Sequence, residues 1–106
     1  MTTMLERTRM ILRGEVPPPP IASLLGFTLT SVGAGEAAVE LKVDGRLANP
    51  MGTLHGGVLC DIADAAMGMA WASTLGEGET FTTLELKINF LKPVWSGTLR
   101  ARGRVV

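Results

Sequence analysis

Alternating apolar and polar positions predict extended strands in four parts of the chain. In Phe27–Ser31 and Glu36–Val43, successive side chains fall on opposite faces, and Gly33-Ala34-Gly35 supplies a flexible turn between them. These two segments are predicted to form a hairpin. Phe81–Leu91 alternates apolar with polar residues most regularly, and Leu99–Val105 alternates again with three arginines on its polar face. The pattern predicts a mainly antiparallel sheet with one apolar and one polar face.

The longest helix is expected between the two pairs of strands, from Gly56 to about Leu75. At about 1.5 Å per residue it would be about 30 Å long, enough to cross a small domain. Its two aspartates would be costly in lipid, so we expect a core helix rather than a membrane span. Upstream, Met1–Arg13 is weakly helical and peripheral, Pro17–Pro20 is extended, and Ile21–Gly26 forms one turn closed by its glycine. One helix packed on the apolar sheet face gives an α+β domain.

Composition limits the class of protein. The 106 residues, 46% hydrophobic and 19% charged, describe one small globular domain whose modest core favours oligomerisation. Ten basic residues balance ten acidic ones, so charge gives no reason to expect nucleic acid as a partner. The single cysteine, Cys60, excludes an intrachain disulfide, and the N-terminus lacks a secretory pattern, so we expect a cytoplasmic protein without membrane contact. No cysteine–histidine cluster has metal-ligand spacing.

The loop before the long helix holds the candidate chemistry. His55 is followed directly by Gly56 and Gly57, where the helix is expected to begin. A helix N-terminus carries free N–H groups and a positive partial charge, and glycines let a ligand approach the backbone closely. Such a place suits a carbonyl oxygen that becomes negative during acyl transfer. Asp64 lies almost two turns beyond Gly57, on the same side of the helix, where a carboxylate can address the reacting carbon or a water.

Other interpretations of these residues stay open at this point. His55 is the only histidine and could be structural, but its place before two glycines favours a site. Asp61 sits three residues before Asp64 and could be the reactive acid instead. Cys60 has no base assigned by spacing and is expected to be a small apolar residue rather than a nucleophile. Three further side chains are expected in the core rather than in an acyl pocket: Met67, Met69 and Trp71.

The run from Asn49 to Ala70, with His-Gly-Gly and an acid nine positions after the histidine, resembles the hotdog-fold thioesterases of the phenylacetate-pathway and 4-hydroxybenzoyl-CoA type. Thr82–Pro93 resembles the strand that follows the helix in that family, and the likeness covers about residues 20 to 106. It implies a hotdog domain in residues 21–106, one long central helix packed on a mainly antiparallel sheet, after a helical and proline-rich segment in residues 1–20. Because the family sheet continues further, we expect this domain to be short at its C-terminus and to lack the last strand or strands.

The resemblance also implies roles for five residues. Asp64 matches the family's general base or nucleophile, a choice that stays open, and Thr83 matches the hydroxyl that helps to place the water. The backbone N–H of Gly56 matches the oxyanion donor, Asn49 the polar side chain that orients water or thioester, and His55 the histidine beside the thioester carbonyl. Asp64 and Thr83 would come from one subunit and the other three from its partner, in a homodimer or a dimer of dimers (a homotetramer).

The expected reaction is hydrolysis of an acyl-CoA thioester to a free acid and coenzyme A. Coenzyme A is part of the substrate, so no separate cofactor is expected. Arg100, Arg102 and Arg104 could bind the phosphates of coenzyme A or form an ordinary solvated sheet face. Two alternatives remain: a hydratase or dehydratase of the same fold that acts on acyl-CoA or acyl carrier protein, and a non-catalytic acyl-CoA-binding module.

Overall fold

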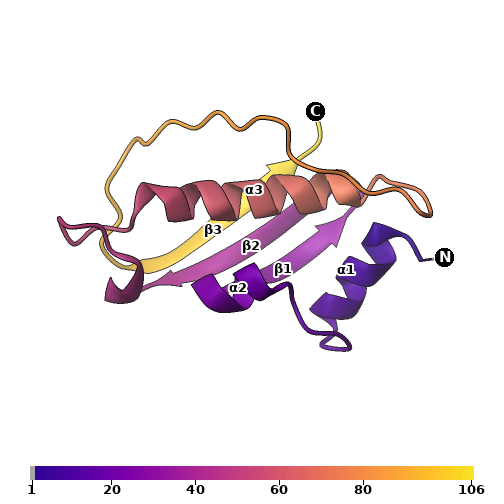
Figure 1. Ribbon diagram of the computed structural model, residues 1–106, viewed down its shortest axis with the longest axis horizontal. Helices are drawn as coiled ribbons and strands as arrows, with labels where there is room; N and C mark the ends of the chain where they lie inside the picture. The colour runs from indigo at the N-terminus through magenta and orange to yellow at the C-terminus, as the bar shows by residue number, and fades with distance from the viewer. Residues whose placement is uncertain (1) are drawn as a thin grey trace.

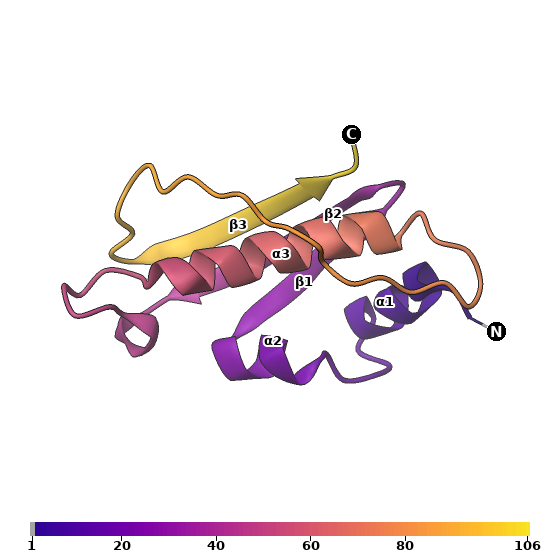
Figure 2. The ribbon, with the colours of Figure 1, turned by 45° about the horizontal axis from the view of Figure 1, so that its top comes forward.

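The computed structural model describes residues 2–106, which form two layers, a sheet and a long helix packed across it (Figure 1). The sheet has the order β1–β2–β3 and is antiparallel throughout. Figure 2 shows α1 and α2 beside β1, away from β3. The elements in chain order are α1 (Met4–Leu12), α2 (Pro20–Leu25), β1 (Phe27–Gly33), β2 (Glu36–Val43), the 3-10 helix η1 (Gly45–Leu47), α3 (Gly56–Ala72) and β3 (Gly97–Arg104).

The core lies between β2 and α3. Val39 and Leu41 point inward from β2 and are each 1% exposed, as the two-residue period of a strand requires. Ile62 and Ala66 meet them from α3, where they lie one turn apart on its buried face. The predicted strand Glu36–Val43 and the hairpin that it forms with the strand before it are confirmed.

β3 passes so close beneath α3 that one position accepts only glycine. A Cβ on Gly103 would overlap the carbonyl oxygen of Ala66 and lie 2.7 Å from the amide nitrogen of Met67. Both are backbone atoms of α3, so no side-chain rotation relieves the contact. Leu99 and Ala101 lie on the same face of β3 and pack against the core, which places the arginines of β3 on the opposite face.

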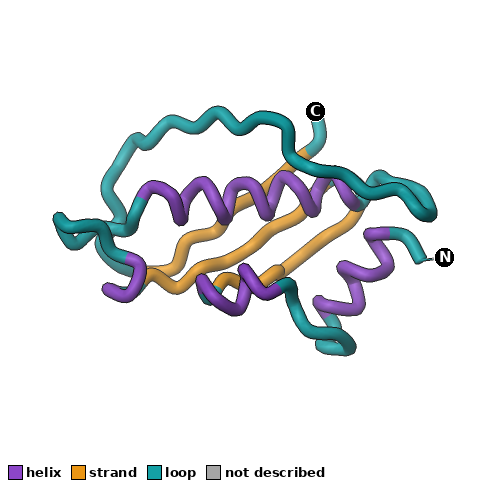
Figure 3. The backbone as a smooth tube through the Cα atoms, viewed as in Figure 1, coloured by secondary structure: helices purple, strands orange, loops and turns teal. Residues whose placement is uncertain are grey.

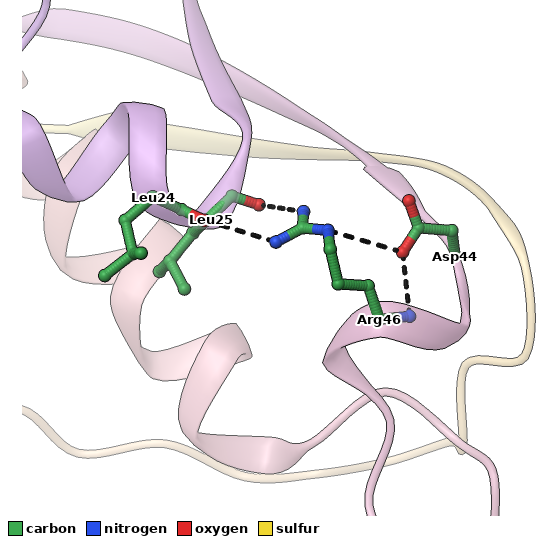
Figure 4. Close-up of polar contacts among 4 residues, drawn as sticks. All are labelled: Leu24, Leu25, Asp44 and Arg46. Carbon is green, nitrogen blue, oxygen red and sulfur yellow. Dashed lines mark hydrogen bonds and ion pairs between the residues drawn. The ribbon is translucent and has the colours of Figure 1, made fainter.

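Polar contacts cap the first N-terminal helix and hold the second in place. α1 begins with a capping box, in which Thr3 and Glu6 each accept a hydrogen bond from the other's backbone N–H. Gly26 closes α2 with a left-handed conformation (φ 87°). Arg46 donates to the carbonyl oxygens of the last two residues of α2 at 3.2 and 2.9 Å, and Asp44 accepts from the Arg46 backbone (Figure 4). The predicted N-terminal helix and the single turn after the prolines are confirmed.

The prediction of a strand at Phe81–Leu91 is wrong. This segment is extended but pairs with no strand within residues 2–106, and Figure 3 draws it as part of the loop between α3 and β3. Alternation creates two faces, but a strand also needs a neighbour for its N–H and C=O groups, and β3 bonds only to β2 in this part of the chain. The long helix also ends before Leu75, at Ala72, where the Ser73 hydroxyl accepts from the Gly35 N–H at 2.8 Å.

Candidate active site

The beginning of α3 leaves the Gly56 N–H free. His55 is the N-cap, because its Nδ1 accepts from the Gly57 N–H at 2.9 Å and its carbonyl oxygen accepts from Val58 at 3.0 Å. The Gly56 N–H donates to no acceptor in residues 2–106. Since Nδ1 is an acceptor, a neutral His55 carries its proton on Nε2, which is a second donor. This end of the helix can therefore receive a carbonyl oxygen.

Asn49 holds the loop that leads into α3. Its Oδ1 accepts from the backbone N–H groups of Met51 at 3.0 Å and Thr53 at 3.1 Å, and its Nδ2 donates to the Thr53 hydroxyl at 2.7 Å. Both acceptor positions of Oδ1 are thus used, and one hydrogen on Nδ2 is left for a ligand. Thr53 is buried and was not singled out from the sequence. The sequence signal that could have indicated Thr53 was the Asn-Pro pair, because an asparagine side chain in such a turn bonds to the backbone a few residues further on.

A cavity of about 280 Å³ lies beside this end of α3. It is lined by Asn49, Thr53, Gly56 and Lys92, among other residues. The Phe90 ring stands against Gly56, so that a Cβ there would lie 3.2 Å from ring atom Cζ. The apolar lining residues are Leu54, Leu59, Phe90, Leu91, Pro93 and Val94. Sequence reasoning assigned Phe90 only to the apolar face of a strand and gave no indication that it meets α3.

Asp64 and Thr83 form a second polar pair farther along α3. Thr83 Oγ1 donates to Asp64 Oδ1 at 2.7 Å, and within residues 2–106 Oδ2 has no hydrogen-bond partner. Asp61 is exposed and has no such partner in the described chain. Asp64 lies eight positions after Gly56, so the two residues are about 12 Å apart along the helix axis. One chain therefore brings Asn49, His55 and Gly56 together at one place, and Asp64 with Thr83 at another.

The three arginines of β3 lie on the sheet face opposite α3. Arg100 donates to Oε2 of Glu40 from Nη2 at 2.7 Å and from Nε at 3.2 Å. Arg102 and Arg104 are exposed and line a hollow of about 830 Å³ that Met67 of α3 also lines. Binding of coenzyme A phosphates at these arginines stays a prediction.

Two side chains expected in the core lie elsewhere. Met67 and Trp71 are 45% and 47% exposed, whereas Met69 is half-buried beside the Thr8 hydroxyl. Cys60 is half-buried as well. Within residues 2–106, no three histidine, cysteine, aspartate or glutamate side chains gather as a metal site would require. No helix in that range is both long enough and apolar enough to cross a membrane.

Relatives of known name match much of this chain. Residues 51–106, just over half of the chain, match the thioesterase superfamily. The proofreading thioesterase EntH of Klebsiella pneumoniae is 35% identical over 80 residues, which are 76% of this chain and 58% of that protein. Human acyl-coenzyme A thioesterase 13 is 29% identical over 98 residues, 92% of this chain and 69% of that protein. The chain spans about three fifths of the length of the first curated relatives that it matches.

A solved structure shares the arrangement of one long helix on an antiparallel sheet. A phenylacetic acid degradation-related protein of Ralstonia eutropha JMP134 superposes with a TM-score of 0.81 at 34% identity, over 92% of this chain and 75% of that chain. The expected α+β hotdog fold is thereby confirmed. The chain belongs to the thioesterase superfamily.

Proposed function

We propose that the protein hydrolyses an acyl-CoA thioester to a free acid and coenzyme A, at sites that two copies of the chain build together. The observation that carries this proposal is the separation of the free Gly56 N–H from the Asp64–Thr83 pair on α3, about 12 Å along the axis. A base must come within about 3 Å of the proton that it removes, directly or through one water, so these groups cannot serve one carbonyl within a chain. In a dimer, the Gly56 N–H of each copy is completed by the Asp64–Thr83 pair of the other copy. The similarity to acyl-coenzyme A thioesterase 13 supports the choice of substrate.

The proposed chemistry uses two half-sites, one formed by Asn49, His55 and Gly56 and the other by Asp64 and Thr83. The thioester carbonyl oxygen accepts from the Gly56 N–H, and the positive end of α3 stabilises the negative charge that develops there. One such donor is worth about 10²–10³ in rate. Asp64 of the other copy takes a proton from water, whose oxygen bonds to the carbonyl carbon. The carbon–sulfur bond then breaks, and the coenzyme A thiolate takes a proton. Thr83 holds Oδ1 of Asp64, which leaves Oδ2 to act on the water.

Direct attack by Asp64 is the alternative chemical route. The carboxylate oxygen would bond to the acyl carbon, coenzyme A would leave, and water would open the mixed anhydride. Label found in the Asp64 carboxylate after a single turnover in heavy-oxygen water would demonstrate this route, because label enters that carboxylate only if the anhydride forms and water attacks its aspartyl carbon.

The substitution Asp64→Asn tests the assignment. Release of free thiol, followed with a disulfide reagent, should fall to background while circular dichroism stays as in the wild type. Asp61→Asn is the matched control, since Asp61 is an exposed carboxylate on the same helix, and it should keep activity. A fully active Asp64→Asn protein would refute the assignment. The same assay excludes a hydratase, which releases no thiol, and a binding module, which binds acyl-CoA without turnover.

Mixing two inactive variants tests whether the site is shared. In a dimer formed from one Asp64→Asn chain and one His55→Ala chain, one site carries both changes and the other carries neither. Random mixing makes half of the dimers mixed, so about a quarter of wild-type activity should return. No recovery, with mixed dimers demonstrated by mass spectrometry, would show that each site belongs to one chain.

A further inference from the structure

The Phe90 ring lies end-on against the residue whose N–H is proposed to hold the carbonyl oxygen. The three atoms nearest to a Cβ built on Gly56 are Cζ at 3.2 Å, Cε1 at 3.4 Å and Cε2 at 3.7 Å of that ring. These atoms are the far end of the side chain. The Phe90 ring and the Gly56 backbone therefore border the same cavity.

The cavity at this point suits a small apolar group. Its volume of about 280 Å³ lies at or below the lower end of the about 300–1,000 Å³ typical of small-molecule pockets. Leu54, Leu59 and Val94 form apolar walls around the ring. The coenzyme A arm is long and ends in phosphates, which need water or charged partners. The acyl group is the half of the thioester that these walls can enclose.

We propose that Phe90 determines specificity by limiting the acyl length that the site accepts, so that the substrates are short or compact apolar acyl thioesters. This inference rests on the proposed acyl-CoA hydrolysis and adds the substrate class to it. The ring is the part of the cavity wall that lies against Gly56, where an acyl group held at that N–H would enter. Its removal opens that end of the cavity to the exposed side of the segment, because Phe90 itself is 56% exposed.

A series of straight-chain acyl-CoAs that grows by one methylene at a time tests the proposal. Each methylene that enters an apolar cavity raises kcat/KM about fourfold. In the wild type this rise should stop at a short chain, and in Phe90→Ala it should continue for about two further carbons or more, since a ring has been removed. Phe90→Trp, a larger ring that fills the same place, should stop the rise earlier and tests the proposal if the alanine variant does not fold.

Leu84→Ala is the matched control. Leu84 lies on the same alternating face of the same segment, is 99% exposed and does not line the cavity, so its profile should match the wild type. If active Phe90→Ala protein keeps the wild-type chain-length limit, or if its kcat/KM changes by the same factor at every chain length, Phe90 does not limit acyl length. The proposed function would still stand. Absence of thiol release by the wild type from every member of the series overturns the proposed function, and this inference with it.

Discussion

A methyl group added at Gly103 would have to share space with the backbone of α3. The Cβ would lie 2.5 Å from the carbonyl carbon of Ala66 and 2.7 Å from the nitrogen of Met67, and it would overlap the Ala66 oxygen. A real Cβ does not approach other atoms so closely. Either α3 must rise from the sheet, which separates Ile62 and Ala66 from β2, or β3 must move away from α3, which strains its pairing with β2.

The expected cost follows from that geometry. Extra volume in a packed core costs about 1–3 kcal/mol when side chains can adjust. Here the obstructing atoms are backbone, so Gly103→Ala should cost at least about 3 kcal/mol. That cost is a large part of the free energy of unfolding of a typical domain, about 5–15 kcal/mol. In a domain of this size it lowers the melting temperature by about 10–20 °C.

Thermal melts followed by far-ultraviolet circular dichroism, at one fixed protein concentration, measure this effect. Gly45→Ala is the matched control, because a Cβ there meets nothing within 4 Å and its φ is not positive; its melting temperature should change by only a few degrees. If Gly103→Ala has the same melting temperature as Gly45→Ala, α3 and β3 do not lie as close as described.

Three further predictions concern the site. His55→Ala should cost about 1 kcal/mol in urea melts through loss of the cap to Gly57, while His55→Asn, a good N-cap, should recover stability but not activity; recovery of both would exclude a role for Nε2. Thr83→Val should lower kcat about tenfold with little change in KM, and Thr83→Ser should restore it in steady-state kinetics. Arg102→Ala combined with Arg104→Ala should raise KM about tenfold for acyl-CoA, but not for a thioester of a short thiol without phosphates; an equal rise for both contradicts phosphate binding.

The parts of the fold that sequence patterns predicted well depend on neighbours along the chain. Glu36–Val43 begins and ends as predicted, because its alternation is regular and a glycine-rich turn precedes it. The end of α3 was placed three residues too late, because tighter turns continue the helical path after Ala72, where the Thr74 and Leu75 N–H groups donate to carbonyl oxygens three positions earlier. Phe81–Leu91 was wrong for a different reason, since alternation does not reveal which strand is available as a partner.

The same distinction separates the candidate site residues. His55, Gly56 and Asn49 belong to one loop and one helix start, so their geometry follows from capping and turn chemistry over a few residues. Thr83 reaches Asp64 across 19 positions and was suggested only by family resemblance. Phe90 meets Gly56 across an even longer separation, and an apolar residue in an alternating pattern has too many possible neighbours for that contact to be foreseen.

The spacing of the two half-sites restricts how two copies can meet. For Gly56 of one copy to lie beside Asp64 of the other, and the reverse, the two α3 helices must run antiparallel about a twofold axis. That axis passes midway between the two positions, which is at Cys60. Helices in contact lie about 8–10 Å apart, so the two Cys60 side chains should approach each other near the axis.

A short bifunctional thiol reagent tests this arrangement. Cys60 is the only cysteine of the chain, so any covalent dimer on a denaturing gel must join two copies of it, and Cys60→Ser should give none. The reagent should produce such dimers at concentrations where gel filtration shows a dimer. If Cys60 in that dimer reacts with the reagent and yet no cross-link forms, the two α3 helices do not meet about this axis. Gly56 and Asp64 of different copies then cannot share a thioester, whatever activity the protein has.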